Sequence, residues 1–151
     1  MVFKRIFSPK CVIMDIESEE KDELFEELAQ AIYSANPDFD REEALASIRE
    51  RESKMTTGIM HSVAVPHGTS RSVKGCVGAI GISRKGIDYE SLDGSPVHFV
   101  FLIVCGEGED ELHLEVLKDL AVVLQDKDFI PRLQQLETPQ EVCEFLCRAE
   151  E

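Results

Sequence analysis

Basic residues are scarce in this sequence: 16 Lys and Arg stand against 30 Asp and Glu, and the formal charge is -14 over 151 residues. A protein that binds nucleic acid needs a basic surface to displace counterions from phosphates, so we expect no nucleic-acid partner. The same deficit argues against docking on anionic membranes. The acidic surface either attracts basic partner proteins, because opposite charges speed encounter, or serves only to keep the protein solvated.

Long hydrophobic runs are also missing. The longest, Phe99–Cys105, is far too short to cross a bilayer, and no apolar stretch near Met1 could serve as a signal peptide. The five cysteines are odd in number and form no CxxC pair. Cys143 and Cys147 are four residues apart, and we interpret them as apolar packing residues rather than a reactive or metal-binding pair. We therefore expect a cytoplasmic protein without membrane insertion.

Several catalytic motifs are absent as well. The chain has no GxxxxGK(S/T) loop for nucleotide phosphates, no HExxH, no paired-cysteine zinc pattern and no GxSxG. These absences exclude the usual ATP-dependent kinases, zinc proteases and serine hydrolases. We expect no cofactor and no metal, so any phosphoryl group has to come from another protein.

The order of apolar patterns predicts an α/β fold in one domain, residues 1–151. Strands are expected at Cys11–Ile16, Cys76–Ser83 and Val97–Cys105, with two short extended pieces in 56–65 around 60–62. The first two helices are expected after the N-caps Ser18 and Asp40, and end near 36–37 and 51–53. Three more helices are expected at 109–125, 128–136 and 139–148, and turns at 84–86 and 93–94. Small residues at 78, 79 and 81 should let another part of the backbone approach closely.

His67 lies just after the extended segment Val63–Val65 and is followed by Gly68, Thr69 and Ser70. A proline stiffens its approach, and backbone N–H groups after the glycine could reach an anion, with the two hydroxyls as further donors. A neutral imidazole at the tip of a strand can be the nucleophile that phosphoryl capture requires. The alternative, a loop histidine with a satisfied hydrogen bond, stays open on these residues alone.

Two further side chains could serve a phosphoryl group. His113 falls in the first turn of the helix 109–125, where the helix terminus favours anions and a neutral imidazole; a half-buried histidine bonded to a carbonyl is the alternative. Arg51 ends the second helix, and its guanidinium could clamp phosphoryl oxygens or simply pair with neighbouring acids. His98 is interpreted as structural, and His61 is given no role.

Several motifs follow one another in order. The segment from Arg51 to Gly68 contains Arg-Glu, Thr-Gly and Val-Ala-Val-Pro-His-Gly, and residues 111–121 read Glu-Leu-His-Leu-Glu-Val-Leu-Lys-Asp-Leu-Ala. Gly-Ile-Asp-Tyr at 86–89 and Leu-Asp-Gly-Ser-Pro at 92–96 lie between them. Together they resemble the enzyme IIA subunits of the bacterial phosphoenolpyruvate-dependent sugar phosphotransferase system, in the fructose/mannitol and nitrogen-regulatory branch. The resemblance covers nearly the whole chain.

This resemblance implies a mixed sheet of about five strands sandwiched by helices. It aligns His67 with the phosphorylated histidine, His113 with the second active-site histidine and Arg51 with the phosphate-binding arginine. It also implies partners: the histidine phosphocarrier protein as donor, and a IIB domain or a regulatory target protein as the next partner. His67 would accept the phosphoryl group and pass it on for sugar uptake or act in nitrogen-type regulation. The alternative is a non-relay regulator that binds a target protein and is switched by phosphorylation of His67.

One departure from the family pattern adjoins the site. Where members usually carry small residues, often Gly-Asn-Gly, this chain has Met60, His61 and Ser62. We expect this bulkier rim to alter the fit of partner proteins.

Overall fold

The computed structural model describes residues 1–58 and 61–151, in which groups of helices precede and follow a central run of strands. The helices are α1 (Val2–Ile6), the short 3-10 helix η1 (Pro9–Cys11), α2 (Lys21–Ala35), α3 (Arg41–Lys54), α4 (Asp110–Leu124), α5 (Phe129–Leu133) and α6 (Pro139–Glu150). The strands are β1 (Val12–Ile13), β2 (Val63–Ala64), β3 (His67–Thr69), β4 (Cys76–Ile87) and β5 (Val97–Cys105). None of the helices in these ranges combines the length and apolar composition that crossing a membrane requires.

The five strands form one mixed sheet in the order β1-β4-β5-β2, with β3 also paired to β5. Only β4 and β5 run antiparallel; β1 pairs with β4, and β2 and β3 pair with β5, in parallel. The predicted mixed sheet of about five strands is therefore confirmed. Because β5 is paired with both β2 and β3 on one side, the segment that carries His67 is fixed to the central strand.

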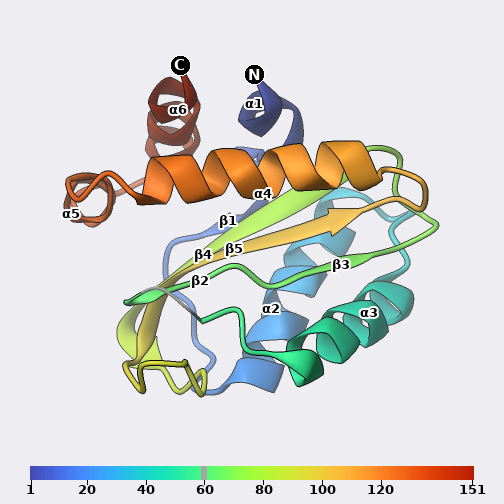
Figure 1. Cartoon of the computed structure of the whole chain (residues 1–151), viewed down its shortest axis with the longest axis horizontal. Coiled ribbons are helices and arrows are strands. Elements are labelled where there is room, and N and C mark those ends of the chain that lie inside the picture. The colour runs from blue at the N-terminus through green and yellow to red at the C-terminus, as the bar shows by residue number, and fades with distance from the viewer. Residues whose placement is uncertain (59–60) are drawn as a thin grey trace.

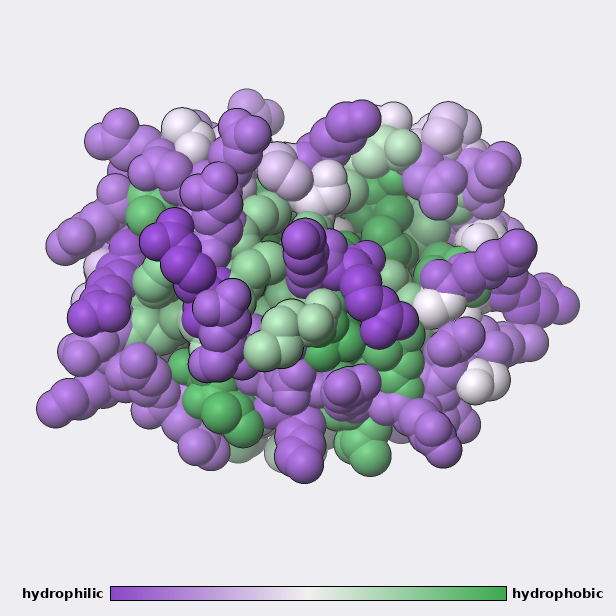
Figure 2. All heavy atoms as spheres, turned by 90° about the horizontal axis from the view of Figure 1, so that it is seen from above, coloured by the Kyte–Doolittle hydropathy of each residue, from purple (hydrophilic) through white to green (hydrophobic). Residues whose placement is uncertain are grey.

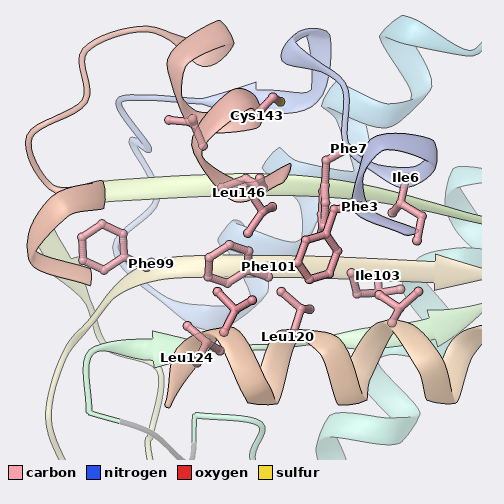
Figure 3. Packing of buried hydrophobic residues seen from close by; sticks show 14 of the residues in the cluster. Phe3, Ile6, Phe7, Phe99, Phe101, Ile103, Leu120, Leu124, Cys143 and Leu146 are labelled. Atoms are coloured by element: carbon pink, nitrogen blue, oxygen red, sulfur yellow. The ribbon is translucent and has the colours of Figure 1, made fainter. Parts of the chain in front are cut away.

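Helices cover both faces of the sheet, as Figure 1 shows: α1, α4 and α6 lie over one face, and α2 and α3 over the other. Strand β5 explains why both faces are covered, because its side chains alternate between two apolar clusters. Phe99, Phe101 and Ile103 point into the cluster beneath α4 and the terminal helices, where Figure 3 shows them against Phe3, Leu120 and Leu146. Val100, Leu102 and Val104 point into the cluster beneath α2 and α3. This two-sided burial was predicted from the unbroken apolar sequence.

The first two long helices begin differently from each other. In α3, Asp40 accepts a hydrogen bond from the backbone N–H of Glu43 at 3.1 Å, so the predicted N-cap is confirmed. In α2 the N-cap is Glu20, and the predicted cap Ser18 was wrong. The Ser18 hydroxyl instead donates to the Glu27 carboxylate at 2.6 Å, which holds the loop before α2 against the second turn of that helix.

Other boundaries also differ from the sequence prediction. The first strand is shorter than 11–16, because Cys11 belongs to η1 and only Val12 and Ile13 pair as a strand with β4. The predicted turn at 84–86 is wrong: β4 continues to Ile87, with a register shift and a positive φ of 92° at Gly86. Of the extended pieces predicted in 56–65, β2 covers Val63–Ala64, while residues 59–60 lie outside the described part of the chain.

Helix α1 has no counterpart in the prediction. It is five residues long, and its N–H groups at Val2 and Phe3 donate to the Glu150 carboxylate at the end of α6, both at 3.1 Å. The two ends of the chain therefore lie together, as Figure 1 shows. A Cβ atom at Gly78 would collide with the ring of Phe7 just after α1. The close approach predicted at the small residues of β4 is thus made by side chains rather than by another backbone.

Strand register also joins two cysteines. Cys76 lies directly opposite Cys105 on the antiparallel pair β4 and β5, and their sulfurs form a disulfide. Cysteine spacing did not predict this bond, since 29 residues separate the pair in sequence. Cys143 is buried in the cluster beneath the terminal helices and Cys147 packs against it, which matches the apolar role expected for them.

Candidate functional site

His67 is the first residue of β3, and the pairing of β3 with β5 fixes its backbone. It is in register with Ile103 of β5, and the backbone N–H of Ile103 donates to the carbonyl of Pro66 at 3.1 Å. Proline has no N–H of its own, so the chain makes its turn towards β3 without leaving a donor unpaired at that position. The ring is half-buried rather than walled off from solvent. The sequence predicted His67 at the exposed end of the extended segment before Pro66, but it did not predict that His67 itself begins a strand.

The residues after His67 are held by α3. A Cβ atom at Gly68 would lie 2.9 Å from both the backbone N of Ile48 and the hydroxyl of Ser47, so only glycine allows this contact. The N–H of Thr69 donates to Ser47 Oγ at 2.8 Å, and the N–H of Ser70 donates to the carbonyl of Cys105 at 2.9 Å. The Ser70 hydroxyl donates to Glu43 at 2.9 Å. These hydrogen bonds attach β3 to its neighbours, so the N–H groups of Thr69 and Ser70 and the Ser70 hydroxyl already have partners within the protein.

The hydrogen bond of the His67 ring determines which nitrogen is free. Nδ1 lies 3.0 Å from the carbonyl oxygen of Val65, which can only accept a hydrogen bond. In the neutral ring Nδ1 therefore carries the proton, and Nε2 keeps its lone pair. Sequence reasoning missed this carbonyl, because a backbone acceptor two residues before the histidine gives no signal in the side-chain pattern.

His113 brings a second imidazole to the first. The centroids of the His67 and His113 rings are 5.2 Å apart, and the ring planes stand at 82°. His113 lies in the first turn of α4, as predicted, and its backbone N–H donates to the carbonyl of Glu109 at 2.9 Å. Its Nε2 is buried and has no hydrogen-bond partner within residues 1–58 and 61–151. A buried ring nitrogen without a partner beside a second histidine is a group that a ligand could satisfy.

Arg51 shares a pocket with His67. The pocket measures about 270 Å³, and apart from Arg51, Thr56, Thr57 and His67 its lining is apolar: Met55, Val63, Val65, Leu117, Leu120, Ala121 and Leu124. One guanidinium nitrogen of Arg51 donates to the carbonyl of Met55 at 2.9 Å, which fixes the side chain against the end of α3. The structure thus brings together all three side chains that the sequence singled out. His67 contacts the ring of His113 and shares the pocket with Arg51.

The surroundings keep both imidazoles neutral. Burial lowers the pKa of His67 below its ordinary value; the Val65 carbonyl and the charge of Glu52 oppose this, and the Arg51 charge adds to it. Burial also lowers the pKa of His113, and the neighbouring His67 ring lowers it further against the opposing charge of Asp110. At neutral pH the site therefore presents two uncharged rings and one cation.

Two of the three residues that depart from the family pattern, His61 and Ser62, lie within the described part of the chain. Ser62 has a φ of 71°, a region that favours glycine, and its carbonyl accepts from the N–H groups of His98 and Phe99 at 2.8 and 3.0 Å. His61 is 84% exposed, and its Nδ1 lies 3.6 Å from the Asp93 carboxylate; Met60 lies outside the described residues.

The His98 ring bonds through Nδ1 to the carbonyl of Ser83 at 2.8 Å, as a structural histidine does. Among the described residues, no group of three or more His, Cys, Asp or Glu side chains could hold a metal ion.

Comparison with known proteins identifies the family. Residues 5–149 match the family described as the phosphoenolpyruvate-dependent sugar phosphotransferase system, EIIA 2. The chain belongs to this family, and the resemblance noted from its motifs is confirmed. It is 33% identical over 146 residues to the fructose-specific EIIABC component of Bacillus subtilis. That alignment covers 97% of this chain but only 23% of the relative, so the chain spans about a quarter of that protein's length.

Solved structures support the same fold. The crystal structure of the nitrogen regulatory protein IIA-Ntr from Neisseria meningitidis superposes with a TM-score of 0.88 at 27% identity, covering 97% of this chain and 99% of that one. The mannitol enzyme IIA of Escherichia coli, solved in complex with phosphorylated enzyme IIB, gives a TM-score of 0.77 at 20% identity, covering 94% and 97% of the two chains. The second likeness concerns the fold alone. Proteins named as fructose-specific and as nitrogen-regulatory are thus both among those similar to this chain.

Proposed function

We propose that this chain is a phosphohistidine carrier in which Nε2 of His67 accepts a phosphoryl group from a histidine phosphocarrier protein. The observation that carries this proposal is the hydrogen bond from His67 Nδ1 to the Val65 carbonyl, because it leaves the lone pair on Nε2. The phosphorus–nitrogen bond of the donor breaks as a new bond forms to Nε2, so no oxidant, metal or nucleotide takes part. In the second transfer a partner nucleophile takes the same group from His67.

His113 and Arg51 would stabilise the charge on the phosphoryl oxygens. The transferring group carries negative charge on three oxygens, and preorganised donors are what lowers its barrier. The unpaired Nε2 of His113 can donate one hydrogen bond when it carries the ring proton. The guanidinium of Arg51 has further N–H groups beside the one that holds Met55.

We propose a IIB domain as the receiving partner. The Escherichia coli mannitol enzyme IIA is named in complex with phosphorylated enzyme IIB, and its fold matches this chain closely. The apolar pocket lining beside His67 gives such a partner a surface to pack on. Figure 2 shows the face over α1, α4 and α6 as mostly hydrophilic with scattered apolar side chains. Two apolar side chains of α4, Leu114 and Val122, are 69% and 60% exposed.

A regulatory role is the second candidate, and the likeness to IIA-Ntr favours it. In that case the chain binds a target protein, and the doubly charged group on His67 switches the interface by local electrostatics. For either role we propose a single domain, residues 1–151, acting in the cytoplasm. In a reducing compartment the disulfide between Cys76 and Cys105 would form only on oxidation.

Phosphorylation by purified components tests the proposal. The protein is incubated with labelled phosphoenolpyruvate, enzyme I and the phosphocarrier protein, and acid-labile label on the chain is measured. We expect label on the wild type and none on His67→Ala; label that persists in the variant would contradict the assignment. A pull-down that compares wild type with His67→Asp separates relay from regulation. If the chain is a regulator, the set of proteins that it captures should differ between the two forms; if it is only a relay, the set should be the same.

A further inference from the structure

Glu52 is a buried acid beside the site to which the steps above give no role. Its side chain is 5% exposed and accepts hydrogen bonds from the backbone N–H and the hydroxyl of Thr57, at 2.8 and 2.7 Å. It also accepts from the hydroxyl of Tyr89 at 3.0 Å and lies 3.3 Å from the ammonium of Lys21. Burial raises the pKa of Glu52, but the hydrogen bonds from Thr57 and the Lys21 charge outweigh this and hold it below its ordinary value. The carboxylate is therefore ionised at neutral pH.

Through Thr57, this carboxylate is connected to the nucleophile. The carbonyl of Thr57 accepts from the N–H of Val65 at 3.3 Å, and the carbonyl of Val65 accepts from His67 Nδ1 at 3.0 Å. Val65 therefore links the two residues: its carbonyl fixes the tautomer of His67, and its N–H is bound to Thr57. A shift of Thr57 would move Val65 and turn the His67 ring.

The same segment also holds the arginine. Arg51 and Glu52 are consecutive residues in the last turn of α3, so their side chains leave the helix in different directions. Arg51 lines the pocket and donates to the carbonyl of Met55 at 2.9 Å, while Glu52 points inward to Thr57. Met55 therefore anchors the Arg51 guanidinium, and Thr57, two residues further on, anchors the His67 ring through Val65.

We propose that Glu52 is a positioning residue for phosphoryl transfer: by fixing Thr57, it sets the orientation of His67 and the place of Arg51. This inference rests on the proposed function of His67. The charge of Glu52 also acts on the ring directly, since it raises the pKa of His67 against the effects of burial and Arg51. Removing that charge while keeping the shape of the side chain should therefore change two quantities, the transfer rate and the pKa of His67.

Glu52→Gln tests the proposal. The amide can still accept from the Thr57 N–H but carries no charge, so we expect the pKa of His67, measured by NMR titration of its ring signals, to fall. Misplacement by about 1 Å can lower a rate by about 100-fold, and we expect a loss of up to that size in phosphorylation of His67. Glu50→Gln is the matched control, because it removes the same charge from an exposed position on the same helix; both quantities should stay at their wild-type values.

A second variant covers the case in which Glu52→Gln does not fold. Lys21→Gln removes, at a partly exposed position, the cation that helps to hold the Glu52 carboxylate ionised and in place, so the rate of His67 phosphorylation should fall. A folded Glu52→Gln with wild-type rate and wild-type His67 titration would overturn the inference, as would a folded Lys21→Gln variant with wild-type rate. If the wild type takes no label, the proposed function fails, but the titrations need no donor and still decide whether Glu52 acts on His67.

Discussion

The rings of His67 and His113 meet edge to plane, with their centroids 5.2 Å apart and their planes at 82°. One ring is tied to the Val65 carbonyl through Nδ1, and the other has a buried Nε2 with no partner in the described part of the chain. The pair therefore combines a free lone pair on one ring with an unused nitrogen on the other. The first of these suits an attacking nucleophile, and the second suits a donor to the group that is attacked.

His113→Ala should slow phosphorylation of His67 by about two to three orders of magnitude, because removing one preorganised donor typically has an effect of that size. The nucleophile remains, so label should still accumulate on His67 at long incubation. Rapid-quench measurement of the labelled fraction gives the rate. His98→Gln is the control, since His98 bonds to the Ser83 carbonyl on the neighbouring strand β4 and does not line the pocket that contains His67. Equal rates in the two variants would contradict the donor role of His113.

Acid pH should destabilise the protein through the two site histidines. Burial lowers the pKa of both in the folded state, so below the ordinary histidine value of 6.5 the unfolded chain binds more protons than the folded one. The contribution of the two histidines to the free energy of unfolding is therefore fully present above pH 6.5. It declines as the pH falls from 6.5 through the pKa values of the two rings in the folded state. Urea unfolding between pH 7.5 and about pH 5 measures this slope.

The double variant His67→Gln, His113→Gln is the control for that slope. Glutamine does not titrate, so the decline between pH 6.5 and pH 5 should become shallower in the variant. NMR titration of the wild type should place both imidazole pKa values below 6.5. A slope that does not change in the double variant would assign the pH dependence to carboxylates elsewhere in the chain.

Arg51→Lys should impair phosphoryl transfer although it keeps the charge. Lysine has no planar fork, so it cannot hold the Met55 carbonyl with one N–H and offer others to phosphoryl oxygens. We expect a loss of about 10-fold or more in the rate of label transfer, since charged hydrogen bonds contribute roughly 1.5–3 kcal/mol. Arg49→Lys is the matched control, because Arg49 pairs with Asp22 and Glu26 on α2. A similar loss in both variants would point to a general effect on α3.

Much of the fold could be predicted because its signals are local. The apolar run at 97–105 and the periodic helices α2, α3 and α4 were predicted within one to four residues of their observed bounds. The errors arise where distant residues decide the structure. Helix α1 is held by Glu150 at the other end of the chain, and Ser18 is drawn away from a capping role by Glu27. Neither partner is visible in a local window of sequence.

The candidate site was predictable in its side chains but not in its backbone. The motif around His67 and the one around His113 singled out the two rings, and α4 places His113 in its first turn as expected. The sequence could not indicate that Thr69 and Ser70 bind α3 and β5, or that the carbonyl of Val65 selects the tautomer. Those contacts depend on how β3 lies between α3 and β5, which only the assembled fold determines.

Removing the disulfide between Cys76 and Cys105 should lower the free energy of unfolding. The bond joins strands β4 and β5 at the end next to Thr69, and closing a loop of 29 residues contributes roughly 3.6 kcal/mol in the chain-entropy account. We expect oxidised protein to show three free thiols when denatured without reductant, from Cys11, Cys143 and Cys147, and five after reduction. Urea unfolding with and without dithiothreitol then measures the difference in stability.

Cys76→Ala separates the bond from other effects of the reductant. This variant has no disulfide to break, so dithiothreitol should leave its unfolding midpoint unchanged while it lowers that of the wild type. Its label transfer from the phosphocarrier protein should persist, because neither cysteine lines the pocket that His67 shares with Arg51. Five free thiols in denatured, oxidised wild-type protein would show that β4 and β5 hold the two sulfurs opposite each other without joining them, and the reductant should then have no effect on stability.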